Sequence, residues 1–118
     1  MTAEPEISGT IVLDSSADSV GYELSGSTVS FGGRIDIDSV TSSPRNFFDV
    51  TGLPFQVANI TDRGGMSSAT LTMIKGGVFS VVPSLILTNS YGFRVYTDPS
   101  TLVNGDSFYF RGAYFTED

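Results

Sequence analysis

Residues 28–38 read TVSFGGRIDID, and apolar and polar side chains alternate along them. Val29, Phe31, Ile35 and Ile37 occupy odd positions, whereas most even positions are polar. Successive side chains of a β-strand point to opposite faces, so a period of two puts one face on a core and the other in water. The stretch is therefore predicted to be a strand with its odd residues buried.

The segment just before it has the same pattern. Val20, Tyr22 and Leu24 alternate with small or polar residues, and Ser25-Gly26-Ser27 separates the two segments. Three small residues that include Gly have the length and composition of a hairpin turn. We expect the two segments to pair antiparallel.

Further extended runs follow, separated by turn residues. A second hairpin is predicted by the alternation at residues 69–73, the turn residues Lys75-Gly76-Gly77 and the run 78–82. Pro83 lacks an amide donor, so it either ends that strand or lies at a bulge on a sheet edge. The remaining runs are residues 85–87, 93–96 and 107–115. No segment holds a helical period for more than two turns. About eight short strands with turns between them predict an all-β antiparallel sandwich or jelly roll.

Composition excludes several classes of function. The 118 residues carry a net charge of -7 and contain no His and no Cys. A strongly acidic chain repels phosphate backbones and anionic lipid, so neither nucleic acid binding nor membrane insertion is expected. Disulfides and Cys or His metal ligands are absent from the sequence, and no apolar run is long enough to span a membrane.

Some acidic residues have a spacing that metal ligands or catalysts can have. Asp36 and Asp38 lie two apart on one predicted strand, with Asp49 further along, which is a conceivable Ca²⁺ set. Carboxylates at this spacing are more often simply solvated, and a glycoside hydrolase needs two of them across a cleft. The prediction is therefore no metal, no cofactor and no enzymatic activity.

Arginine and tyrosine side chains are the remaining candidates for ligand contact. Arg34, Arg94 and Arg111 each lie within a predicted strand, where pairing with acids or stacking on rings is favoured over ligand binding. Carbohydrate rings stack on aromatic faces, so a ligand-facing surface is conceivable for the three tyrosines Tyr91, Tyr96 and Tyr109. The alternative for these rings is a core or interface position.

The chain contains the run Gly52-Leu53-Pro54-Phe55 and, near the C-terminus, a predicted aromatic strand with Gly112 and Tyr114. The sequence resembles the C-terminal knob domains of bacteriophage tail fibres and related virion-surface jelly rolls. The resemblance depends on these two segments, on the Tyr strand, small turn and Gly-Arg-Ile strand of residues 21–35, and on a Ser-rich loop at residues 40–44. The likeness covers residues 20–115. It implies a homotrimer of β-sandwiches around a three-fold axis.

Surplus apolar side chains agree with a subunit interface. Phe47-Phe48 and the run containing Leu85 and Leu87 place apolar groups on both faces of their strands, which is more than one core face needs. These four residues are the candidate trimer interface.

The resemblance implies a place on the outside of a phage particle. We divide the chain into an N-terminal arm, residues 1–6, and one β-sandwich domain, residues 7–118. A short chain beginning at Met1 favours a non-enzymatic capsid decoration, or cement, protein that uses the arm to contact neighbours such as the major capsid protein. The alternative is the receptor-binding tip of a virion fibre, which recognises a host surface glycan or protein.

Overall fold

The computed structural model describes residues 1–6, 8–15, 19–59 and 68–117. They form ten strands and one 3-10 helix, and no helix among them is long and apolar enough to cross a membrane. The elements are β1 (Thr2–Pro5), β2 (Gly9–Leu13), β3 (Ser19–Ser25), β4 (Thr28–Ser42), β5 (Phe48–Thr51), β6 (Ser68–Lys75), β7 (Val78–Val82), β8 (Ser84–Ile86), β9 (Gly92–Val95), η1 (Pro99–Thr101) and β10 (Ser107–Phe115).

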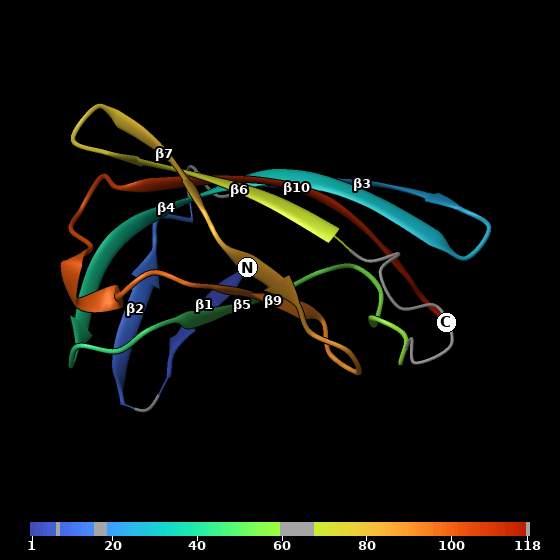
Figure 1. Cartoon of the computed structure of the whole chain (residues 1–118), viewed down its shortest axis with the longest axis horizontal. Coiled ribbons are helices and arrows are strands. Elements are labelled where there is room, and N and C mark those ends of the chain that lie inside the picture. The colour runs from blue at the N-terminus through green and yellow to red at the C-terminus, as the bar shows by residue number, and fades with distance from the viewer. Residues whose placement is uncertain (7, 16–18, 60–67, 118) are drawn as a thin grey trace.

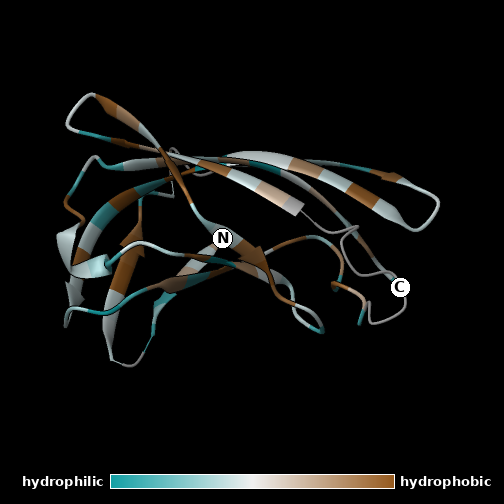
Figure 2. Cartoon of the chain, in the orientation of Figure 1, coloured by the Kyte–Doolittle hydropathy of each residue, from teal (hydrophilic) through white to brown (hydrophobic). Residues whose placement is uncertain are grey.

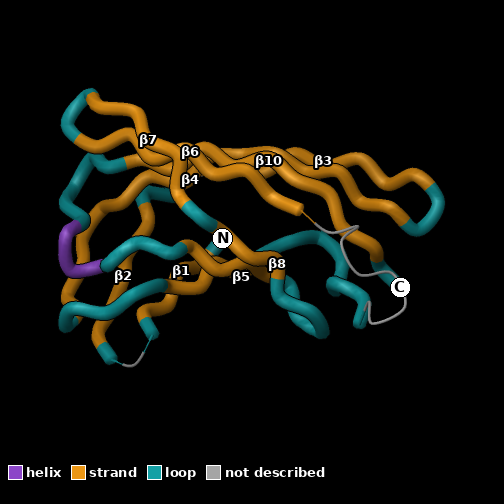
Figure 3. Tube along the Cα trace, in the orientation of Figure 1, coloured by secondary structure: helices purple, strands orange, loops and turns teal. Residues whose placement is uncertain are grey.

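The strands form one antiparallel sheet that folds into two layers (Figure 1). The order is β7-β6-β10-β4-β2-β1-β5-β9-β8, and β3 also pairs with β4. We call β3, the first part of β4, β10, β6 and β7 the long layer, and β2, β1, β5, β9 and β8 the short layer. Figure 3 shows strands in both layers, with the 3-10 helix at one end.

The strand β4 belongs to both layers. Its residues 28–36 pair with β10, and residues 37–42 pair with β2. The register with β2 shifts between Val12 and Leu13, a bulge at which the ladder bends. At the opposite edge Pro83 separates β7 from β8, and Ser84 Oγ donates to the Ala69 carbonyl at 3.1 Å. The sheet is therefore nearly closed on itself.

The predicted fold class and both predicted hairpins are confirmed. Tyr22 pairs with Phe31 and Leu24 with Val29 in the first hairpin, and β6 pairs with β7 in the second. The apolar side chains of β3 are exposed, however, where the alternation predicted burial. The β3–β4 hairpin extends past the short layer in Figure 1, so little of the chain covers it.

Two predicted boundaries differ from the structure. Residues 40–42, expected in a Ser-rich loop, continue β4, because β2 supplies a partner for their backbone. Most of the segment expected to be an arm forms β1, which pairs with β2 and with β5 inside the short layer. Ile7, the first residue of the expected domain, lies outside the described residues.

Aromatic side chains fill the core between the layers. Phe31 of β4 stacks on Phe93 of β9 and contacts Phe110 of β10, and Phe48 meets Phe108 edge to face. All five are buried, as are Ile35 and Ile37, which the alternation placed inside. Aromatic pairs at these separations add to the stabilisation that burial provides.

Tyr114 joins the two segments on which the family resemblance depends. Its side chain is fully buried, and its hydroxyl donates to the Phe55 carbonyl at 2.8 Å and accepts from the Phe55 amide at 3.3 Å. Gly52 and Leu53 donate their amides to the Tyr91 carbonyl at 3.0 and 2.9 Å. The segment 52–55 is thus held to β10 on one side and to the β8–β9 turn on the other.

Two adjacent glycines of β4 have opposite surroundings. A Cβ on Gly33 would lie 2.2 Å from the Ser19 carbonyl oxygen and 2.7 Å from the Phe110 ring. A Cβ on Gly32 would have nothing nearer than the Phe110 carbonyl oxygen at 3.5 Å, an ordinary contact. Of these two positions, only that of Gly33 lacks room for a side chain.

We predict that Gly33→Ala lowers the free energy of unfolding by about 1–3 kcal/mol, because the methyl group must displace a backbone carbonyl. The matched variant Gly32→Ala is expected to change it by less than about 0.5 kcal/mol. Urea unfolding followed by circular dichroism measures both. Equal stability of the two variants would contradict the packing assigned to Gly33.

Tyr114→Phe is predicted to lower the free energy of unfolding by about 1–2 kcal/mol, because the variant leaves the Phe55 carbonyl without its hydroxyl donor. Tyr91→Phe is the control, since the exposed Tyr91 contributes only its carbonyl to the bonds described above. The same urea titration applies. A Tyr114 variant as stable as the control would show that the hydroxyl does not hold the 52–55 segment.

Candidate binding surface on the outer face of the long layer

The outer face of the long layer is the face turned away from the core. Alternation along β10 sends Phe108 and Phe110 inward and leaves Tyr109 and Arg111 outward. Tyr109 pairs with Arg34 of β4 on one side and with Thr72 of β6 on the other. Side chains from three strands therefore meet in one row on this face.

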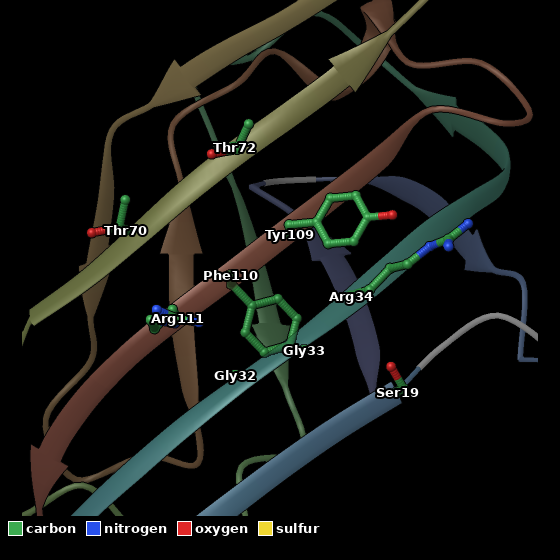
Figure 4. Close-up of a pocket in the computed structure, with 9 residues that line it drawn as sticks. All are labelled: Ser19, Gly32, Gly33, Arg34, Thr70, Thr72, Tyr109, Phe110 and Arg111. Carbon is green, nitrogen blue, oxygen red and sulfur yellow. The ribbon is translucent and has the colours of Figure 1, made fainter. Parts of the chain in front are cut away.

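A groove of about 730 Å³ lies on this face (Figure 4). Its lining residues are Ser19, Gly32, Gly33, Arg34, Thr70, Thr72, Tyr109, Phe110 and Arg111. Gly32 is paired with Gly21 of β3, and neither carries a side chain on the outer face. A second hollow of about 560 Å³ adjoins the first, shares Gly32 and Arg111 with it, and reaches Glu23 and Ser30. The backbone of β3 and β4 is thus the floor of a continuous depression.

Arg34 forms one wall of the groove and is held in place. Its Nε and Nη2 donate to the two carboxylate oxygens of Asp36 at 2.7 and 2.6 Å, and its guanidinium lies 5.5 Å from the centre of the Tyr109 ring. The hydrogen bonds from Arg34 lower the pKa of Asp36 below its ordinary value. Figure 4 shows Arg34 and Tyr109 side by side. Pairing and stacking, as expected from the sequence, occupy this arginine.

Arg111 differs from the other basic groups of the strands. Arg34, Lys75 and Arg94 form ion pairs with Asp36, Asp106 and Asp49. Arg111 is exposed at the groove and has no ion pair with any residue in the described ranges. The pairing expected for it is therefore not present within this part of the chain, and Glu23 lines the adjoining hollow together with Arg111.

The strand β7 forms an apolar ridge at the edge of the same face. Phe79 pairs with Ile74 and Val81 with Thr72, so both project outward, and they are 69% and 78% exposed. We call these two side chains the β7 ridge. Figure 2 shows the apolar colour along this hairpin. Val81 and the groove residue Thr72 are cross-strand neighbours, so the ridge borders the groove.

The three candidate ligand-facing tyrosines lie in different places. Tyr109 is in the groove, Tyr91 precedes β9, and Tyr96 follows β9 and meets the Phe47 ring edge to face. Tyr91 and Tyr96 therefore flank opposite ends of one strand of the short layer. The fold does not bring the three rings into one sugar-stacking surface.

The four candidate interface residues divide between core and surface. Phe48 is 0% exposed and packs on Phe108, which corrects its assignment to a subunit interface. Its neighbour Phe47 points the other way and lies under the Arg94 guanidinium at 3.8 Å from the ring centre. Leu85 is exposed and Leu87 half-buried, with Ile86 inward between them. Phe47, Leu85 and Leu87 remain on the outside of the short layer.

The carboxylates considered for a metal or for catalysis each have their own partner. Asp49 accepts from Arg94 Nε at 2.8 Å, and Asp38 accepts from the Asn104 side chain at 3.1 Å. Asp36 is held by Arg34. Within the described residues no three acids, His or Cys gather into a group that would hold a metal ion.

Two features that shape this face do not follow from alternation alone. They are the missing side chain at Gly32 and the outward position of Phe79 and Val81. The signal was in the register: once Val81 is set opposite Thr72, both of these apolar residues lie on the face that Arg34 and Tyr109 occupy. A Gly at the even position of an otherwise alternating strand also marks missing side-chain volume on that face.

No family model and no curated protein matches the chain. Among solved structures, the crystal structure of the Dettilon tailspike protein is similar, with a TM-score of 0.66 and 21% sequence identity. The match covers 97% of this chain and 22% of the tailspike chain. Nearly all of the fold described above is therefore shared with a part of a tailspike.

Proposed function

We propose that the chain is a non-enzymatic structural domain on the surface of a phage particle, within a tail spike or fibre. The observation that carries this proposal is the fold shared with part of a tailspike over 97% of the chain. The knob-domain resemblance of the sequence, which depends on Gly52-Leu53-Pro54-Phe55 and Tyr114, points in the same direction. A domain of this kind acts through the surfaces that it presents to other proteins.

The chemistry of the side chains supports a non-enzymatic role. The sequence lacks His and Cys, the residues used most often for proton transfer and nucleophilic attack near neutral pH. A general acid among the carboxylates would need a raised pKa, whereas that of Asp36 is lowered by Arg34. Asp106 is buried and held by Lys75 Nζ at 2.7 Å.

Within this proposal we place the domain in the tail rather than on the capsid, and the support is that the structure sharing its fold is called a tailspike. In this role the domain packs within the appendage, and contact with a host surface glycan or protein is a further task of the whole appendage. A homo-oligomer is part of the proposal, since an appendage knob is a closed assembly of copies.

The proposal predicts where an antibody binds on intact particles. Gold-labelled antibody against this chain is expected to decorate the tail end of virions in negative-stain electron microscopy, because an exposed appendage domain leaves its epitopes accessible there. Pre-absorbing the antibody with the purified chain should remove the label. Gold spread over the capsid would return the assignment to decoration, and gold absent from particles that carry the protein would reject a virion-surface role.

A further inference from the structure

The depression on the outer face of the long layer can be followed row by row across the strands. In the order β3, β4, β10 and β6, one row holds Ser19, Arg34, Tyr109 and Thr72. The next row holds Gly21, Gly32, Arg111 and Thr70. The third row begins with Glu23 and Ser30. Successive rows are about 7 Å apart, because they are two residues apart along each strand. The two adjoining hollows together extend over all three rows.

The Tyr109 ring is an aromatic platform in the first row. It is 42% exposed, and Figure 4 shows it face-on between Arg34 and Thr72. The face of an aromatic ring carries partial negative charge, so it attracts C–H groups, which carry partial positive charge. A sugar ring presents such C–H groups on its flat side. In the next row the paired glycines Gly21 and Gly32 have no side chains, which leaves room for a second ring beside the first.

Two charged side chains with opposite hydrogen-bonding roles line the second hollow. Arg111 has only donors and Glu23 has only acceptors, and both are exposed. Within the described residues neither forms an ion pair. Two neighbouring hydroxyl groups of a sugar can accept from one such side chain and donate to the other. The hydroxyls of Thr70 and Ser30, which also line the depression, can either donate or accept.

The lining disfavours other classes of ligand. A peptide that adds to a sheet needs an open strand edge, whereas β10 at the centre of the depression is paired on both sides, with β4 and β6. An anion would meet Glu23 as well as Arg111, on a chain with a net charge of -7. A ligand without polar groups would leave these charged and hydroxyl side chains without hydrogen bonds. A ligand that is uncharged and rich in hydroxyl groups avoids all three penalties.

We propose that the depression binds an uncharged oligosaccharide, with one sugar ring stacked on Tyr109 and the hydroxyl groups of the next sugar bonded to Arg111 and Glu23. The spacing of about 7 Å between rows places consecutive sugars over Tyr109 and over Arg111. This inference rests on the proposed function, because it gives this domain a share in the contact between the appendage and a host glycan. Binding is measured on the isolated chain, whereas the proposed function is tested by position on the particle.

The first test is a glycan array probed with the fluorescently labelled 118-residue chain. The array carries uncharged oligosaccharides of hexoses and N-acetylhexosamines, together with uronate-bearing and sulfated oligosaccharides of the same lengths. We expect the chain to be retained on uncharged oligosaccharides and not on the charged ones. Retention on none of the uncharged oligosaccharides would overturn the inference. Retention on the charged ones alone would also overturn it, because the depression would then be an anion site.

The second test locates the site by isothermal titration with the oligosaccharide that the array retains best. Tyr109→Ala, which removes the platform, and Gly32→Val, which fills the floor without a backbone clash, are each expected to weaken binding by about tenfold or more. Tyr109→Phe keeps the ring and should keep the affinity. Ser39→Val is the control outside the depression, since Ser39 is exposed on the part of β4 that pairs with β2. Circular dichroism establishes that each variant is folded.

Two results of the titration would contradict the site. Unchanged binding in Tyr109→Ala or in Gly32→Val means that the sugar lies elsewhere on the chain. Loss of binding in Tyr109→Phe means that the hydroxyl, and not the ring face, makes the contact. The two proposals fail separately: a chain that binds no oligosaccharide while gold labels the tail overturns only the inference about the depression, and a chain that binds one while gold labels the capsid overturns only the tail location.

Discussion

The architecture depends on β4, the one strand that both layers share. Its residues 28–36 provide a ladder for β3 and β10, and its residues 37–42 provide one for β2, from which β1 and β5 follow. At the other edge the layers meet through the connection at Pro83 and the hydrogen bond from Ser84 to the Ala69 carbonyl, whereas β4 carries a backbone ladder through both layers. The bulge beside Leu13 lets a single strand turn through the corner without leaving the sheet.

The same strand sets the geometry of the outer face. Gly33 and Gly32 are consecutive, yet the first is needed because the Ser19 carbonyl and the Phe110 ring occupy the space of a side chain. The second leaves a hollow on the other side of the sheet, where no packing requires it.

Alternation of apolar and polar residues was enough to predict the long strands and both hairpins. It failed for segments that become strands only because a neighbouring strand pairs with them, and for the strand at the N-terminus. Between residues 29 and 37 the alternation is long enough to show that the odd-numbered residues face the core. Gly26 and Gly76-Gly77 mark the two hairpin turns. β1 has four residues and only one buried side chain, that of Ala3, so it shows no alternation that would predict a strand. Residues 41–44, Thr-Ser-Ser-Pro, have the composition of a loop, and Thr41 and Ser42 extend β4 because β2 pairs with them. The groove is lined by residues of β3, β4, β6 and β10, and the register in which these four strands pair cannot be read from a single sequence.

The two edges of the long layer expose apolar side chains on opposite faces of the sheet. Val20, Tyr22 and Leu24 of β3 pair with Gly33, Phe31 and Val29, so they project on the core side, beyond the reach of the short layer except where Tyr22 meets the Phe55 ring at 5.7 Å. The β7 ridge projects on the outer side. One plane of contact cannot reach both sides of a sheet. Phe55, which contacts Tyr22, is itself held by two hydrogen bonds with the Tyr114 hydroxyl, so the 52–55 segment connects the β3 edge to the buried end of β10.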